Sequence, residues 1–183
     1  MMTTPNYLVL STLGPDRPGL VADVTDYITS RGGNVEESRM MVLGAEFGML
    51  VLVSGTEEVV AKIAKDALDL GTKIGAGVLT RRTKSPEEHR RGVGIPCSVK
   101  AEALDHEGIV RAVALAISKL GINIVSLETT AYNAPITGSP LFRLEARVDV
   151  PQGVPMAQLR KTMVEVGQRE NLDIEVKTLI ASG

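Results

Sequence analysis

The sequence has few of the residues that build metal clusters, disulfides or base-stacking surfaces. Its 183 residues include one cysteine, Cys97, and two histidines. One cysteine can form neither an intramolecular disulfide nor a cysteine-based metal cluster, so we expect no metal, no other cofactor and a reducing, cytoplasmic location. Aromatic residues make up 3% of the chain and tryptophan is missing, so the rings on which single-stranded nucleic acids stack are scarce.

An excess of charge of one sign and long hydrophobic runs are also missing. The 20 basic and 22 acidic residues nearly cancel, whereas binding to a nucleic acid backbone needs clustered basic side chains, so we expect no direct nucleic acid contact. The longest apolar stretches, such as residues 49–53, are far shorter than the roughly 20 residues that cross a bilayer. The first six residues lack the features of a signal peptide. We therefore predict neither export nor a membrane span.

The main feature that is present is an internal repeat. Asp16 recurs as Asp105, an offset of 89 positions (105 minus 16), and the same offset relates a turn, a helical pattern and a Gly-x-Asn segment in each half. A repeat with a fixed offset indicates two copies of one structural unit. We predict a first domain over residues 5–83, a polar linker over 84–93 and a second domain over 94–181. The aligned pairs include Gly19 and Gly108, Leu20 and Ile109, Val24 and Val113, Ile28 and Ile117, and Asn34 and Asn123.

Hydrophobic periodicity predicts the same order of elements in each copy. Residues alternate with period two in the expected strands, as in 97–103 and 141–150, and recur at helical spacing in helices that Gly32 and Gly121 end. The order is βαββαβ twice, an α+β fold of two ferredoxin-like domains in tandem, each a four-stranded antiparallel sheet with two helices on one face. Further expected strands are 34–42, 123–132, 47–53, 73–82 and 173–180, and the expected second helices are 57–70 and 156–169.

The two predicted sheets differ on their outer faces. In the second copy the outer face of 141–150 carries alternating charges. In the first copy, placing Val9, Met49, Val51 and Val53 inward leaves Leu8, Leu10, Leu50 and Leu52 outward. Because an apolar outer face on a small domain is usually covered, we predict that the copies pack together or that the chain forms a homodimer or higher oligomer.

The turn over residues 14–21 opens directly onto a helix and is suited to binding an anion. Unpaired N–H groups and the positive end of the helix dipole attract a carboxylate, and Gly19 removes the side chain that would block its approach. Asp16 could either cap the helix or bind the ammonium group of an amino acid. Asn34 starts the next strand after the Gly32-Gly33 break, and its amide offers both a donor and an acceptor. For Asn34 and Asn123, ligand binding and simple turn capping remain equally open.

The turn 16–21, its helix and Gly33-Asn34-Val35 resemble an ACT domain, and the likeness covers nearly all of the chain. More narrowly, residues 128–132, 134–135 and 138–143 resemble the glycine cleavage system transcriptional repressor family. That resemblance implies regulation by a small amino acid, glycine or similar, bound at ACT interfaces, and action through a protein partner such as a DNA-binding transcription activator. In the first copy the implied ligand contacts are Asp16, Gly19, Leu20, Asn34 and Val35, and we add Arg17 of the same turn. In the second copy they are Asp105, Gly108, Ile109, Asn123 and Ile124.

The second copy departs from this pattern, because His106 and Glu107 replace Arg17 and Pro18. Equal affinity at the two sites is therefore in doubt. An enzyme is an alternative, since Arg17 and Asn34 are the residue types that acylphosphatases of the same fold use. No nucleophile with an adjacent base stands out, however, so we predict a protein without enzymatic activity. A ligand-free interaction scaffold is the second alternative.

Overall fold

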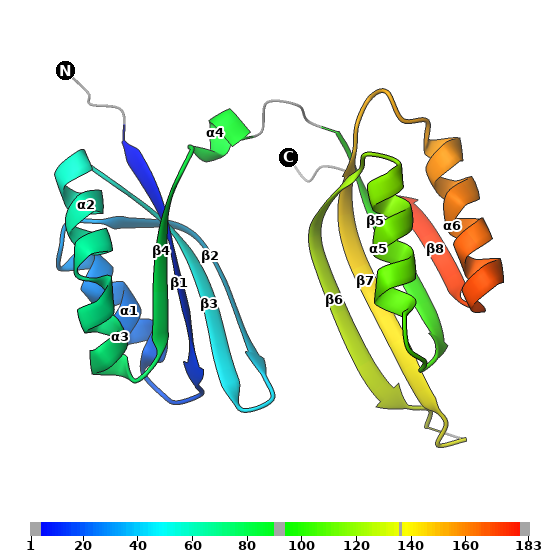
Figure 1. Ribbon diagram of the computed structural model, residues 1–183, viewed down its shortest axis with the longest axis horizontal. Coiled ribbons are helices and arrows are strands. Elements are labelled where there is room, and N and C mark those ends of the chain that lie inside the picture. The colour runs from blue at the N-terminus through cyan, green and yellow to red at the C-terminus, as the bar shows by residue number, and fades with distance from the viewer. Residues whose placement is uncertain (1–4, 90–93, 136, 180–183) are drawn as a thin grey trace. The chain divides into compact units, whose positions relative to one another are not determined.

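The computed structural model describes residues 5–89, 94–135 and 137–179. The chain divides into two compact units, Met1–Arg91 and Gly92–Gly183. Each unit has its own sheet, its own helices on one face of that sheet, and its own hydrophobic core between the two layers (Figure 1). No helix of the described part of the chain is long and apolar enough to cross a membrane.

The first unit contains one antiparallel sheet in the strand order β2-β3-β1-β4, so β3 and β1 are central. Because β1 and β2 lie on either side of β3, the first crossover passes over the sheet and places its helix on one face. The elements of this unit are β1 (Asn6–Pro15), α1 (Leu20–Thr29), β2 (Asn34–Leu43), β3 (Glu46–Gly55), α2 (Glu57–Lys65), α3 (Ala67–Ile74), β4 (Gly77–Thr83) and the short α4 (Pro86–His89).

The second unit repeats this arrangement in the strand order β6-β7-β5-β8. The predicted fold class, two ferredoxin-like units with helices on one face of an antiparallel sheet, is confirmed. Its elements are β5 (Ile95–Leu104), α5 (Ile109–Lys119), β6 (Asn123–Asn133), β7 (Pro140–Val150), α6 (Met156–Glu170) and β8 (Asp173–Thr178).

The first helix of each unit ends at the predicted glycine. Gly32 has φ 84° and Gly121 has φ 69°, a left-handed conformation that only glycine adopts without strain. The N–H of Gly33 donates to Ile28 O at 3.1 Å, and the N–H of Ile122 donates to Ile117 O at 3.3 Å. These bonds form the Schellman motif that closes a helix and turns the chain toward the next strand.

The second helix of the first unit differs from the prediction. Instead of one helix over 57–70, α2 ends at Lys65 and α3 runs to Ile74, so the last strand begins at Gly77 and not at residue 73. The break at Asp66 is stabilised from α1, because Tyr27 Oη donates to Ile63 O at 2.8 Å and Arg31 Nε lies 3.3 Å from Asp66 Oδ2. In the second unit the positions of Tyr27 and Arg31 hold Ala116 and Leu120, and α6 is continuous.

The predicted faces of β1 are wrong. Leu8 and Leu10 are buried, and Val9 points to the outer face. The reason is the register of the sheet: Leu8 lies opposite Val53 and Leu10 opposite Val51, and opposed residues of antiparallel strands share a face. The outward placement of Leu50 and Leu52 is right, since Leu50 is exposed and Leu52 half-buried.

Two further expectations concern the ends of the units. The last strand ends at Thr178, which lies opposite the buried Cys97 and so shares the inner face of the sheet, and Ile180 lies outside the described residues. The proposed linker 84–93 includes α4, and its residues 90–93 lie outside the described range. The exact domain limits 5–83 and 94–181 stay predictions.

Candidate functional site

The two glycine turns have the same backbone geometry. Gly19 (φ 91°, ψ −10°) precedes α1, Gly108 (φ 93°, ψ −5°) precedes α5, and neither helix start is capped by a side chain. The first bonds within the helices run from Asp23 N–H to Gly19 O and from Ala112 N–H to Gly108 O, both 2.9 Å. The N–H groups before them in the first turn are therefore left without helical partners. Together they offer donors for a small anion such as a carboxylate.

The aspartate of each turn is fixed through its backbone. Asp16 N–H donates to Ala45 O at 2.9 Å, and Asp105 N–H donates to Pro140 O at 3.0 Å. These bonds hold each turn against the neighbouring hairpin, while the Asp16 and Asp105 side chains stay exposed. Because α1 has no side-chain cap, capping, one of the two roles considered for Asp16, is not used. Its carboxylate remains available to an ammonium group.

Arg17 lies over the first turn of α1. Its Nη2 is 2.7 Å from Asp23 Oδ2 and its Nη1 donates to Pro18 O at 3.2 Å. Nη1 is also 3.7 Å from the position that a β-carbon on Gly19 would take. The guanidinium thus lies beside the unpaired amides, and its pairing with the Asp23 carboxylate offsets part of its attraction for an anion.

His106 takes the place of Arg17 in the second unit and links its turn to α6. Nδ1 lies 3.0 Å from Glu107 O and Nε2 lies 3.1 Å from Glu170 O. Both partners are acceptors, so only the doubly protonated imidazolium donates to both. These two backbone hydrogen bonds raise the pKa of His106 above its ordinary value of 6.5.

The second unit is expected to be more stable in acid than at alkaline pH through His106. Because the folded-state pKa is raised, the stabilisation is complete below the unfolded value of 6.5 and is lost as the pH rises through the folded value. In urea titrations, the difference between the wild type and His106→Ala should shrink from about pH 5 to about pH 8. His89→Ala, in the first unit, is the matched control. A difference that grows with pH, or one that His89→Ala reproduces, would contradict the assignment.

Asn34 and Val35 lie at the opposite end of the sheet from the turn. Asn34 is opposite Ser54, which is opposite Tyr7, whereas the turn follows Gly14 and Pro15 on the same strand. The seven residue steps from Tyr7 to Gly14 along β1 correspond to roughly 20 Å. The second unit has the same arrangement, with Asn123 opposite Asp149 and Asp149 opposite Pro96. Within a single unit, therefore, the amides of the turn and the asparagine side chain are too far apart to contact one small molecule.

A small polar cluster surrounds Asn34. Asn34 Nδ2 donates to Glu36 Oε1 at 3.0 Å, and Ser54 Oγ donates to the same oxygen. These two hydrogen bonds lower the pKa of Glu36, and the bond from Ser54 has the larger effect. A β-bulge between Val35 and Glu37 re-aims the Glu36 side chain. Sequence reasoning missed Glu36 and Ser54, because a bulge leaves no pattern in a single strand.

The second unit has the bulge but not the cluster. Its register shifts between Ile124 and Ser126, so Val125 takes the place of Glu36. Asn34 Nδ2 donates to Glu36, which leaves the Asn34 carbonyl oxygen as an acceptor, whereas Asn123 lies directly opposite Asp149 on the neighbouring strand. The two predicted sites are thus chemically different at this end as well as at the turn.

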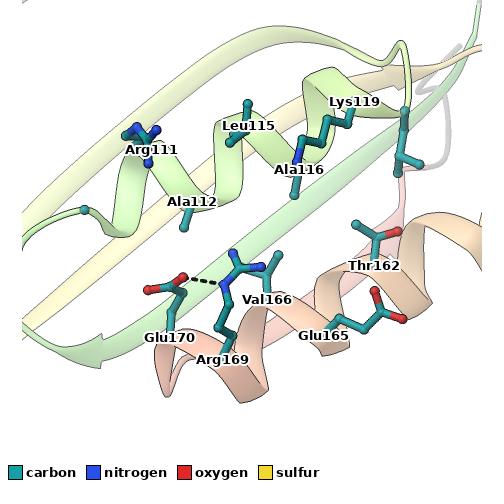
Figure 2. A pocket seen from close by; sticks show the side chains of 12 residues that line it. Arg111, Ala112, Leu115, Ala116, Lys119, Thr162, Glu165, Val166, Arg169 and Glu170 are labelled. Carbon is teal, nitrogen blue, oxygen red and sulfur yellow. Dashed lines mark hydrogen bonds and ion pairs between the residues drawn. The ribbon is translucent and has the colours of Figure 1, made fainter.

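A groove of about 550 Å³ lies between α5 and α6, with Gly108 among its lining residues. Figure 2 shows Ala112 and Ala116 on α5 facing Val166 and Arg169 on α6, and Arg169 paired with Glu170 at 2.7 Å. Arg111 and Lys119 add positive charge to its lining. The corresponding hollow of the first unit is only about 150 Å³, because the Tyr27 ring stands where the second unit has Ala116. Sequence reasoning missed this groove, although the Tyr27 and Ala116 difference is visible in the repeat.

The lone thiol offers no chemistry here. Cys97 is buried, with its sulfur 3.7 Å from Met156 Sδ. Burial raises the pKa of Cys97, so the reactive thiolate is disfavoured. The described residues also contain no cluster of histidine, cysteine and acidic side chains that could hold a metal ion.

Comparison with known proteins agrees with this geometry. Residues 6–79 match the ACT domain family. The match lies in the first unit, and the second unit repeats its topology, so the chain has a tandem ACT-like fold. It resembles the glycine cleavage system transcriptional repressor of Escherichia coli (strain K12), with 34% identity over 82 residues, 45% of this chain and 43% of that protein.

The chain spans less than half the length of the curated repressors that it matches. Solved structures cover more. An unknown protein from Galdieria sulphuraria is 31% identical, with a TM-score of 0.77 over 97% of this chain and 100% of that one. A candidate glycine cleavage system transcriptional repressor is 23% identical, with a TM-score of 0.73 over 97% and 99% of the two chains, and shows the shared fold.

Proposed function

We propose that this chain is a regulatory protein without enzymatic activity that binds a small amino acid, glycine or similar, and changes its affinity for a protein partner. The observation that carries the proposal is the repeated turn, in which Gly19 and Gly108 hold uncapped helix starts in the same left-handed conformation. The ACT match and the resemblance to a repressor support a regulatory role. By analogy with that repressor, the partner is a DNA-binding transcription activator.

The proposed ligand lies between two ACT surfaces. Because the turn and the asparagine are at opposite ends of one sheet, one small molecule can touch both only if the turn of one surface meets the strand start of another. Its carboxylate would bind the N–H groups after Gly19 beside Arg17, and its ammonium would bind the Asp16 carboxylate or the Asn34 carbonyl. The proposed contacts remain Asp16, Arg17, Gly19, Leu20, Asn34, Val35, Asp105, Gly108, Ile109, Asn123 and Ile124.

The alternatives have less support. An acylphosphatase-like site would need Arg17 and Asn34 on one substrate within a single unit, but they lie at opposite ends of the sheet. A ligand-free scaffold explains the fold but gives no reason for two uncapped glycine turns with matching angles. The cytoplasmic location stays a prediction.

Calorimetric titration of the full chain with a panel of amino acids tests the proposal. Gly19→Ala and Gly108→Ala each place a β-carbon at the anion-binding turn, and we expect each to weaken binding at its own site about tenfold or more. Gly138→Ala is the matched control, because Gly138 also has a positive φ and open space around its Cα but lies in the β6–β7 hairpin. Binding should survive in this control.

Two results would count against the proposal. If no amino acid gives a heat signal with the wild type, the scaffold becomes the better explanation. If binding occurs but all three glycine variants behave alike, the ligand lies elsewhere, and the groove between α5 and α6 is the next place to probe.

A further inference from the structure

The outer face of the first sheet is apolar, and the second unit provides an internal control for it. Leu13, Leu50 and Leu79 of this face are 62%, 52% and 70% exposed. At the equivalent register positions of the second sheet stand Glu102, Glu145 and Glu175. Each of these glutamates pairs with a cation on its own face: Arg143, Lys100 and Lys177. The fold therefore does not need leucine at these positions, so the apolar face serves something other than folding.

The apolar face carries its charges at opposite edges. Reading across the sheet in register, Glu37 on β2 is opposite Leu52 on β3, Leu52 is opposite Val9 on β1, and Val9 is opposite Arg81 on β4. Within this row the acid lies on one edge strand, the base on the other, and two aliphatic side chains lie between them. Arg39, two residues further along β2, shares the face and pairs with Glu37. Two shallow hollows that share Val9 and Leu50 follow this row.

We propose that this face is a homodimer interface, in which the first sheets of two copies stack face to face about a two-fold axis parallel to the strands. Such an axis places β2 of one copy over β4 of the other, so Glu37 faces Arg81 of the second copy and Leu52 faces Val9 of the second copy, each twice. Stacked sheets of this kind lie about 10 Å apart and interdigitate their side chains. The contact is isologous, the type that closes a dimer.

The chemistry of the chain selects a second copy as the occupant. The outer face of the second unit is charged, and covering those ions with leucine would cost their hydration. Among the described residues Glu37 is paired only with Arg39 of its own strand, an exposed pair, and Arg81 has no acidic partner. In the proposed dimer, Glu37 of the second copy becomes the acidic partner of Arg81. This inference is independent of amino-acid binding.

Sedimentation equilibrium of the full chain tests the proposal. The wild type should be a dimer, and Leu50→Glu should raise the dissociation constant at least about a hundredfold, since it buries a charge at the centre of the interface. The fold should survive, because the second unit carries Glu145 at this position, and circular dichroism checks this. Leu79→Glu, which introduces the residue type of Glu175, is the second variant. Leu68→Glu, on the helical side of the same unit and 78% exposed, is the matched control and should stay dimeric.

Charge exchange tests the two-fold arrangement. Glu37→Arg and Arg81→Glu should each weaken the dimer, because each places like charges opposite each other, and the double variant should restore it. A monomeric wild type, a dimer unaffected by Leu50→Glu and Leu79→Glu in folded protein, or dissociation by Leu68→Glu to the same extent would overturn the interface. Failure of the double variant to restore the dimer would overturn the axis.

Discussion

Replacing Tyr27 with alanine should lower the free energy of unfolding of the first unit by about 4 kcal/mol. The ring is buried between α1 and the break that separates α2 from α3, and Arg31 Cζ lies 3.8 Å from its centroid. Truncation removes this apolar contact, the cation–π contact and the hydrogen bond to Ile63 O. It should also open a groove between α1 and α3 like the one beside Ala116. Urea unfolding followed by circular dichroism measures the loss.

Tyr27→Phe separates packing from hydrogen bonding in the same experiment. It keeps the ring and leaves only the Ile63 carbonyl without its donor, so the expected loss is about 1 kcal/mol. Similar losses in the two variants would show that the hydroxyl dominates. A loss below about 1 kcal/mol in Tyr27→Ala would show that the ring does not hold the α2–α3 break, because buried aromatic truncations normally cost several times more.

Ile28→Ala and Ile117→Ala should each destabilise one unit by about 3 kcal/mol and leave the other unchanged. The two isoleucines occupy the same position of the repeat, both are fully buried, and each belongs to a separate core cluster. Removing three carbons leaves a cavity in one core only. The pair is therefore its own matched control.

Native-state hydrogen exchange resolved by peptide distinguishes the units, because amides in a central strand exchange only when their unit opens. Ile28→Ala should speed exchange in β1 and β3, and Ile117→Ala should speed exchange in β5 and β7. Equal acceleration in all four strands would mean that the units unfold together. That result would contradict the division into domains 5–83 and 94–181.

Features that depend on near neighbours in the chain could be predicted. The 89-residue offset and the strand periodicity gave the order of elements, and Gly32 and Gly121 ended helices where only glycine fits the left-handed backbone. The turns at Gly19 and Gly108 followed from the repeat and from the helical pattern that begins directly after each glycine. The groove could not be predicted in this way: the difference between Tyr27 and Ala116 is visible in the repeat, but its effect depends on which helix lies opposite.

The sequence by itself determined the class of fold, the number of units and the positions of the glycine turns, since these follow from local backbone preference and from the spacing of apolar residues. The tertiary structure alone decided that Leu8 and Leu10 face the core, that α2 breaks at Asp66, and that Asn34 lies a sheet length away from Asp16. Cross-strand register and helix contacts join residues far apart in the chain, and no local pattern encodes which of them meet.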